Sequence, residues 1–218
     1  MTVLSGLKKV FYAHVPKTGG TYVEDLFVAN GYGKKFWCAD PGKHGLRASY
    51  QHFERALYDP CIDFTKIDYA FITVRHPIDR LLSEYRNSGK DQDIADWVRK
   101  LRNRLSANPY FLDNHFRPQV DFYRPPMEVF RQEDRFSEDW AKTLSDSQGL
   151  EFTTFATHSA RNTQPKARPL SPEEAQAVIT FCVQYYRQDF LAFGYKVEDA
   201  QALREFRRDK DLALANSA

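Results

Sequence analysis

The apolar and polar positions of this chain follow two alternating patterns. Residues 9–15, KVFYAHV, and residues 69–74, YAFITV, are short runs rich in β-branched and aromatic side chains. Such runs are typical of strands that are buried on both faces. The segments that follow them, from Thr21 and from Pro77, carry apolar side chains at helical spacing. We therefore predict two strand–loop–helix units.

Later segments extend this alternation. In chain order we expect an amphipathic helix with a basic outer face, a strand and a helix: residues 91–106, 127–130 and 138–147. The strongest helix signal covers residues 171–190, SPEEAQAVITFCVQYYRQDF. Ser171 is its cap, Pro172 suits the first helical position, and Glu174 completes a capping box. Strands that alternate with helices predict an α/β fold of three layers, in which helices flank a central, mainly parallel sheet.

The composition is that of one globular domain. The chain has 218 residues, and its 17 Phe and 12 Tyr supply a substantial core. We find no internal repeat or linker, and expect a single domain over residues 1–218, with a core at 9–195 and a charged tail at 196–218. The net charge of +2 does not indicate a general nucleic-acid-binding surface.

Cysteine content and apolar runs bear on the compartment. The three cysteines stand far apart, without the spacing of a zinc site or a disulfide framework, which fits a reducing cytoplasm. No apolar run reaches the length of about 18 residues that a membrane span needs. The first residues also lack an apolar core followed by a small-residue cleavage site. We therefore expect a cytoplasmic protein without a signal peptide or a membrane anchor.

The first strand–loop–helix unit has the equipment of a phosphate-binding site. In its loop, PKTGGT, Lys17 precedes Gly19 and Gly20. Glycines allow close approach of the backbone, and the N–H groups and dipole of a following helix attract an anion. Lys17 adds a full positive charge, while Thr18 and Thr21 add hydroxyl groups. This combination disfavours the alternative, an ordinary turn with an exposed lysine.

The loop of a nucleotide triphosphatase has a different order. Its pattern, G-x-x-x-x-G-K-[ST], places the lysine after the glycines, and that spacing is absent here. No apolar strand ends in an acidic residue that would clearly hold magnesium. The loop therefore suggests a ligand whose transferred group carries less charge than the end of a triphosphate, such as a sulfuryl group.

The second unit, FITVRHPIDRLLS, ends its strand at Arg75 and carries Ser83 on the following helix. In an α/β fold, ligands bind beyond the carboxyl ends of the strands, so Arg75 is expected near Lys17. A guanidinium and a hydroxyl that converge there suit a second phosphate. Arg80 and Arg86 are nearby in sequence and are better interpreted as solvated charges of the helix face.

These two elements resemble those of sulfotransferases that use 3′-phosphoadenosine 5′-phosphosulfate (PAPS), especially the carbohydrate-type enzymes. In that family the P-K-T-G-G-T loop holds the 5′-phosphosulfate, and a strand-end Arg with a Ser eight residues later holds the 3′-phosphate. Arg75 and Ser83 match the second pattern. Weaker likeness in HFRPQVDFY, VFRQEDRF and YYRQDFLAFGY extends the resemblance over most of residues 9–195. Many members have a small residue where this chain has Tyr22.

The resemblance implies a P-loop-like fold. It also implies in-line transfer of the sulfuryl group from PAPS to a hydroxyl of a carbohydrate or small metabolite, with no metal required. Lys17 would stabilise the negative charge that builds on the bridging oxygen as adenosine 3′,5′-bisphosphate leaves. The cofactor-binding residues implied by the motifs, or expected beside the adenine, are Lys17, Thr18, Gly19, Gly20, Thr21, Tyr22, Arg75, Ser83, Asn162, Lys166 and Arg168. No nucleic-acid or membrane partner is expected.

Sulfuryl transfer to a hydroxyl needs a general base, which contributes roughly 10²–10⁴-fold. Histidine suits this role near neutral pH. His44, in the loop-like stretch PGKHGLRA, ranks first, because family members often have a Lys-His pair in this region, near the acceptor. His52, on an expected helix, and His115, in the mid-domain segment, follow it. Glu54 and Glu133 are the carboxylate alternatives.

Two functions of other classes stay open. One is a P-loop kinase-like phosphotransferase, which would need magnesium and a triphosphate. The other is a catalytically silent domain that keeps the nucleotide site as a binding or scaffold module. Comparing ATP–magnesium with PAPS for thermal stabilisation separates the first from a sulfotransferase.

Overall fold

The computed structural model describes residues 1–37, 40–89, 92–134, 136–155 and 170–203, with the backbone alone at Lys43 and His44. The chain divides into two compact units. The first comprises Met1–Arg75 and Tyr110–Thr163, and the second His76–Pro109 and Gln164–Ala218, as far as each is described. The first unit contains the sheet, and the second is helical. A single domain over residues 1–218 stays a prediction.

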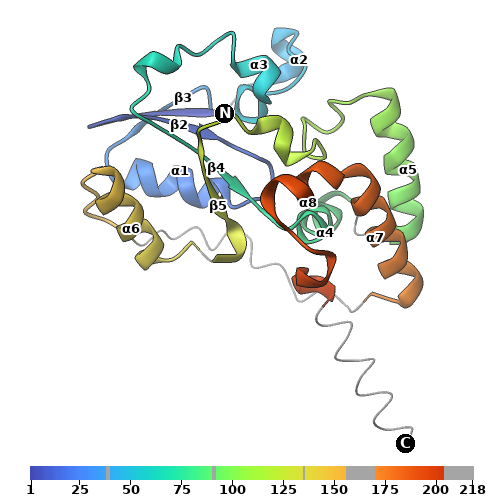
Figure 1. Cartoon of the computed structure of the whole chain (residues 1–218). Coiled ribbons are helices and arrows are strands. Elements are labelled where there is room, and N and C mark those ends of the chain that lie inside the picture. Colours follow the sequence, from blue (N-terminus) through green and yellow to red (C-terminus); the bar gives the residue numbers. More distant parts are fainter. Residues whose placement is uncertain (38–39, 90–91, 135, 156–169, 204–218) are drawn as a thin grey trace, which may run out of the picture. The chain divides into compact units, whose positions relative to one another are not determined.

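A five-stranded sheet in the order β3-β1-β2-β4-β5 forms the centre of the first unit (Figure 1). Its strands are β1 (Thr2–Ser5), β2 (Lys9–Ala13), β3 (Gly33–Lys35), β4 (Tyr69–Val74) and β5 (Glu128–Arg131). β2, β4 and β5 pair in parallel, while β1 runs antiparallel to both β2 and β3. The sheet is therefore mainly parallel, and the carboxyl ends of β2 and β4 lie side by side.

Side chains of the central strands pack against a layer on each face. On one face, Tyr12 and Phe71 stack with ring centroids 4.9 Å apart. They join a buried cluster with helices α1 (Gly20–Ala29) and α6 (Glu138–Gln148), which cover this face (Figure 1). On the other face, Phe11 contacts Tyr58 and Phe64, each at 4.9 Å between centroids. Burial on both faces explains why the central strands are continuous apolar runs.

Short helical segments complete the first unit. They are α2 (Pro41–His44), η1 (Tyr50–His52), α3 (Arg55–Tyr58), η2 (Phe64–Lys66), η3 (Gln119–Phe122) and η4 (Gln132–Asp134). Two of them correct the sequence predictions. His44, expected in a loop, is the last residue of a four-residue helix that Asp40 caps by accepting the backbone N–H of Gly42. His52, expected on a helix, ends a single 3₁₀ turn.

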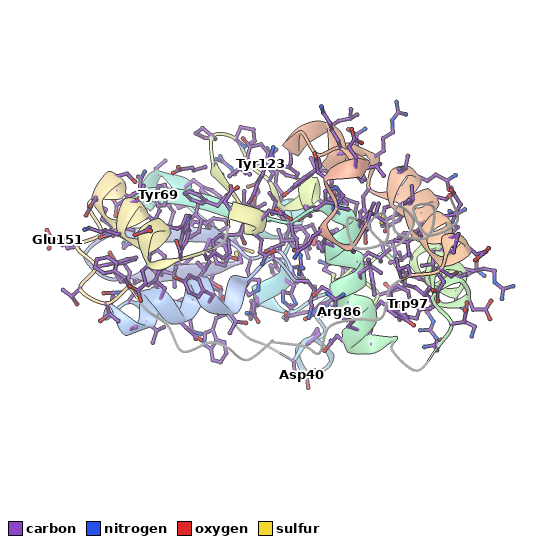
Figure 2. All side chains as sticks on the ribbon, turned by 90° about the horizontal axis from the view of Figure 1, so that it is seen from below. Asp40, Tyr69, Arg86, Trp97, Tyr123 and Glu151 are labelled. Atoms are coloured by element: carbon purple, nitrogen blue, oxygen red, sulfur yellow. The ribbon has the colours of Figure 1, made fainter. Side chains whose placement is uncertain are left out.

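The second unit contains α4 (Pro77–Ser88), α5 (Ile94–Ala107), α7 (Pro172–Tyr185), α8 (Arg187–Phe193) and η5 (Val197–Asp199). Trp97 of α5, labelled in Figure 2, contacts Tyr85 of α4 with ring centroids 5.1 Å apart. The capping box of Ser171 and Glu174 is confirmed at the start of α7. The sequence pattern predicted one helix through residue 190. That prediction is wrong, because Tyr186 leaves the helical conformation and separates α7 from α8.

No helix among the described residues has both the length and the apolar content to cross a membrane. Residues 204–218, most of the charged tail, lie outside the described residues.

Candidate active site

The PKTGGT loop (residues 16–21) leads from β2 into α1. Lys17 and Gly19 both have left-handed backbones, with φ of 69° and 90°. For a residue with a side chain this conformation costs on the order of 1 kcal/mol, and such strain is concentrated at functional sites. Gly19 is also the N-cap of α1 and supplies no side-chain cap. The first-turn N–H groups, at the positive end of the helix dipole, therefore keep the capacity to bind an anion.

Thr18 ties this loop to the neighbouring strand. Its side chain is fully buried, and its hydroxyl donates to the carbonyl of Val15 at 2.8 Å. The same hydroxyl lies 2.8 Å from that of Thr73 on β4, which in turn lies 2.6 Å from the hydroxyl of Tyr12. The sequence suggested that Thr18 offers its hydroxyl to a phosphate. In the structure that hydroxyl anchors the loop to Val15 and Thr73.

The position of the His14 ring leaves room only for glycine at residue 20. A Cβ atom at Gly20 would lie 2.3 Å from Nε2 of His14, closer than atoms approach. Nδ1 of His14 lies 2.8 Å from the buried carboxylate of Glu24. Burial raises the pKa of Glu24, but hydrogen bonds from His14 and Thr2 outweigh it and lower this pKa to about 2. His14 therefore packs beside the loop, with its ring fixed by a carboxylate.

Tyr22 packs against protein. Its ring stacks on Phe136, with centroids 5.8 Å apart and an interplanar angle of 15°, and lies 6.2 Å from Trp140. Its hydroxyl donates to the carbonyl of Ser137 at 3.4 Å. Phe136 also lies where a side chain at Gly19 would be, 2.7 Å from a Cβ there. The aromatic contact accounts for the large residue at Tyr22.

Arg75 follows β4, as the sequence predicts, and reaches the PKTGGT loop. Its guanidinium Nη1 donates to the carbonyl oxygen of Lys17 at 3.4 Å. The fully buried side-chain amide of Gln119 forms two hydrogen bonds with the backbone of Arg75. Gln119 Oε1 accepts the N–H of Arg75 at 2.8 Å, and Gln119 Nε2 donates to its carbonyl at 2.8 Å. The loop and the strand-end arginine thus meet, with Gln119 as a support that the sequence did not reveal.

The remaining residues expected to bind the nucleotide are Ser83, at the second phosphate, and three residues beside the adenine. Ser83 lies half-buried on α4 in the second unit, eight residues after Arg75 in the chain. His76, which follows Arg75 in the chain, caps α4, because Nδ1 of His76 accepts the N–H of Ile78 at 3.2 Å. The residues expected beside the adenine, Asn162, Lys166 and Arg168, lie outside the described residues.

Three of the histidines form a row, the histidine cluster of His14, His52 and His115. The ring centroids of His14 and His52 are 5.4 Å apart, and those of His52 and His115 are 5.0 Å apart. His52 Nδ1 lies 2.8 Å from Oδ2 of Asp113. Two of the three candidate bases, His52 and His115, are thus in contact with each other, and His52 also contacts His14. The side chain of the third, His44, lies outside the described residues.

The carboxylate alternatives are placed differently. Glu54 is buried and accepts hydrogen bonds from Tyr110 at 3.2 Å and from Asn114 at 2.9 Å. These bonds occupy its oxygens and favour a structural role. Glu133 lies exposed in η4. Within the described part of the chain, no group of three or more His, Cys, Asp or Glu side chains is arranged to hold a metal ion.

The histidine cluster makes stability depend on pH. Burial lowers the pKa of His52 from 6.5 to about 4, although Asp113 opposes the shift, and burial also lowers the pKa of His14. As the pH falls from 6.5 through 4, these histidines therefore become protonated in the unfolded chain before they do so in the folded chain. For His52 alone this corresponds to about 3 kcal/mol, present above pH 6.5 and lost by pH 4.

We therefore expect the free energy of unfolding, measured by urea denaturation, to fall steadily over that pH range. Glu24 and Asp113, whose pKa values are both below their ordinary ones, extend the loss to lower pH. A His52→Gln variant should show a shallower slope. Stability that does not change between pH 6.5 and 4 would contradict a buried, neutral cluster.

The geometry defines the class of the site: a strand, a glycine loop with a lysine, and a helix N-terminus, met by an arginine from the next parallel strand. Residues 1–196 match the sequence model of the Sulfotransferase family. The match spans most of the chain, so the chain belongs to this family, which supports sulfuryl transfer as its activity. Comparisons with curated proteins and with solved structures gave no match.

Proposed function

We propose that the protein transfers the sulfuryl group of PAPS to a hydroxyl of a carbohydrate or small metabolite. The observation that carries this proposal is the hydrogen bond from the Arg75 guanidinium to the carbonyl of Lys17. It joins the two sequence elements that resemble phosphate-binding motifs at one edge of the sheet, beyond the carboxyl ends of β2 and β4.

Each element has a role in this proposal. Lys17 and the backbone N–H groups that follow it hold the 5′-phosphosulfate, and Lys17 stabilises the bridging oxygen as charge develops there. The resemblance assigns the 3′-phosphate to Arg75 and Ser83, and the adenine to Lys166, which is outside the described residues. Thr18 contributes its N–H, since its hydroxyl is engaged with Val15 and Thr73. A histidine, His44, His52 or His115, takes the proton of the acceptor hydroxyl.

Exposed aromatic side chains support a carbohydrate acceptor. Phe36 and Trp37, directly after β3, are 41% and 46% exposed. Phe36 has a left-handed backbone, φ 57°, which keeps a large side chain in a strained position. Lys34, whose ammonium lies 4.4 Å from the Trp37 ring centroid, also pairs with Glu24 at 3.3 Å. Trp37 is thus linked through Lys34 and Glu24 to His14, and a sugar ring would stack on the exposed aromatic rings.

The same proposal places the enzyme in the cytoplasm. Cys61 is exposed and Cys182 is buried, and both are free thiols. A free exposed thiol persists in a reducing compartment.

Thermal unfolding with two nucleotides tests the donor. Adenosine 3′,5′-bisphosphate should raise the unfolding midpoint by several degrees at saturation, since it binds the folded state alone. ATP with magnesium should raise it less. A larger shift with ATP–magnesium would favour a phosphotransferase, and no shift with the bisphosphate would contradict the proposal. Binding without any sulfuryl transfer would favour a silent module.

Replacing Gln119 tests the support of Arg75. In Gln119→Ala the backbone N–H and carbonyl of Arg75 lose their buried partners, a loss of about 1–3 kcal/mol. We expect the affinity for adenosine 3′,5′-bisphosphate, measured by calorimetry, to fall about tenfold. The control is Gln176→Ala, an exposed residue of α7. Equal affinity in Gln119→Ala and the parent protein would show that Arg75 needs no such support.

A further inference from the structure

One nitrogen of His52 is held by a carboxylate, and the other forms no hydrogen bond with the described residues. Its Nδ1 lies 2.8 Å from Oδ2 of Asp113. An ionised carboxylate only accepts hydrogen bonds, so Nδ1 carries the hydrogen and Nε2 carries the lone pair. Within the described residues, no side chain or backbone group forms a hydrogen bond with Nε2 of His52. This imidazole is therefore neutral, with its lone pair at Nε2.

Asp113 is itself held firmly. It accepts the backbone N–H of Ser49 at 2.6 Å and the hydroxyl of Ser49 at 2.8 Å. Burial raises the pKa of Asp113, but hydrogen bonds from His52 and Ser49 outweigh it, so the pKa stays below its ordinary value. The carboxylate is thus ionised at neutral pH, with Oδ2 at the His52 imidazole and Oδ1 at the backbone N–H of Ser49.

The backbone around Asp113 is strained. Leu112, Asp113 and Asn114 are three consecutive left-handed residues, with φ of 51°, 55° and 63°. The turn is fastened to the histidine segment a second time, because Nδ2 of Asn114 donates to the carbonyl of His52 at 2.9 Å. One strained turn therefore fixes both the ring and the backbone of His52, a pattern found where a side chain must be held for function.

His14 differs from His52 in the surroundings of Nε2. His14 also has a carboxylate at Nδ1, but it is only 5% exposed and its Nε2 faces Gly20. His115 contacts His52 ring to ring. His52 has its carboxylate at Nδ1 and an Nε2 that forms no hydrogen bond with the described residues.

We propose that Asp113 is the positioning residue that makes His52 the general base of the reaction. This rests on the proposed sulfuryl transfer. Nε2 of His52 removes the proton of the acceptor hydroxyl while its oxygen forms a bond to sulfur. The bond from sulfur to the bridging phosphate oxygen breaks, and its electron pair leaves with adenosine 3′,5′-bisphosphate. Asp113 holds the Nδ1–H tautomer and stabilises the imidazolium that forms.

The first test is the tautomer of His52, read from long-range ¹H–¹⁵N spectra of labelled protein with adenosine 3′,5′-bisphosphate. The wild type should show a protonated Nδ1 and a bare Nε2 at neutral pH. Asp113→Asn should give a mixture of tautomers and a lower imidazole pKa, since Asp113 raises that pKa. A protonated Nε2 in the wild type would overturn the proposal. The wild-type spectrum decides this even if the variant does not fold.

The second test is the rate of sulfate transfer from PAPS, with methyl glucoside and water as acceptor probes. Asp113→Asn should lower kcat by about 100-fold or more, with the affinity for adenosine 3′,5′-bisphosphate unchanged. The matched control is Asp121→Asn, which removes a carboxylate paired with Arg117 in the same segment and should keep its rate within about twofold. A folded Asp113→Asn with an unchanged kcat, or with nucleotide binding lost alongside it, would overturn the assignment.

The two failures are distinguishable. If the wild type binds no bisphosphate and transfers no sulfate, the proposed function fails. The tautomer of the free protein then still decides whether Asp113 sets the chemistry of His52.

Discussion

Replacing Lys17 by alanine should lower the turnover of PAPS by about 10²–10³-fold in a protein that remains folded. The proposed role of the ammonium is to meet negative charge that exists on the bridging oxygen only as the bond to sulfur breaks. Its loss should therefore reduce kcat more than it raises KM for PAPS. The measurement is the initial rate of sulfate release over a range of PAPS concentrations.

The backbone at Lys17 supplies an internal control for stability. Its φ of 69° is strained for a residue with a side chain but not for glycine. Lys17→Gly should therefore be at least as stable as the parent and equally inactive. Lys9→Ala, which removes an exposed lysine at the start of β2, should keep its activity. Turnover that survives in Lys17→Gly would exclude the lysine from the chemistry.

Gly20→Ala should destabilise the protein and abolish nucleotide binding. In a helix this exchange normally stabilises by about 1 kcal/mol. Here the new Cβ would lie 2.3 Å from the His14 ring, and the ring is held by Glu24 at 2.8 Å. Overpacking of this kind typically costs about 1–3 kcal/mol. Either the ring or the start of α1 must move, and both border the proposed phosphate site.

Urea denaturation and bisphosphate titration measure the two effects. The matched control is Gly33→Ala, where the nearest atom to a new Cβ is 3.7 Å away. Adding His14→Ala to Gly20→Ala should remove part of the clash, so the two changes together should cost less than their sum. A Gly20→Ala protein as stable as the parent would show that His14 does not confine this glycine.

The sequence predicted those parts of the fold that carry a strong local signal. β2 and β4 were recognised because both faces of these strands are buried, which makes them continuous apolar runs. The start of α7 was recognised from its capping box. β1 and β3 were missed. They are only four and three residues long, and β3 is mostly exposed, so neither has a periodic pattern.

The residues of the candidate site also divide into those that the sequence predicted and those that it did not. Lys17, the glycines and Arg75 belong to short contiguous motifs, and the structure brings the two motifs together. Gln119 and Asp113 were missed because their partners are distant, 44 residues away for Gln119–Arg75 and 61 residues away for His52–Asp113. The only local sign was Asp113–Asn114, since Asp and Asn tolerate left-handed backbone. Pairs of this kind form only in the tertiary fold, so no regular spacing in the sequence predicts them.

The most direct test of the account is a calorimetric comparison of adenosine 3′,5′-bisphosphate with 5′-AMP, on the parent protein and on Arg75→Ala. A site with separate 5′- and 3′-phosphate elements should bind the bisphosphate at least about tenfold more tightly than 5′-AMP, since a phosphate held by charged hydrogen bonds contributes more than 1.4 kcal/mol. Arg75→Ala should erase that difference and leave 5′-AMP binding unchanged. Equal affinities for the two nucleotides in the folded parent protein, or no binding of either, would contradict a PAPS-type site.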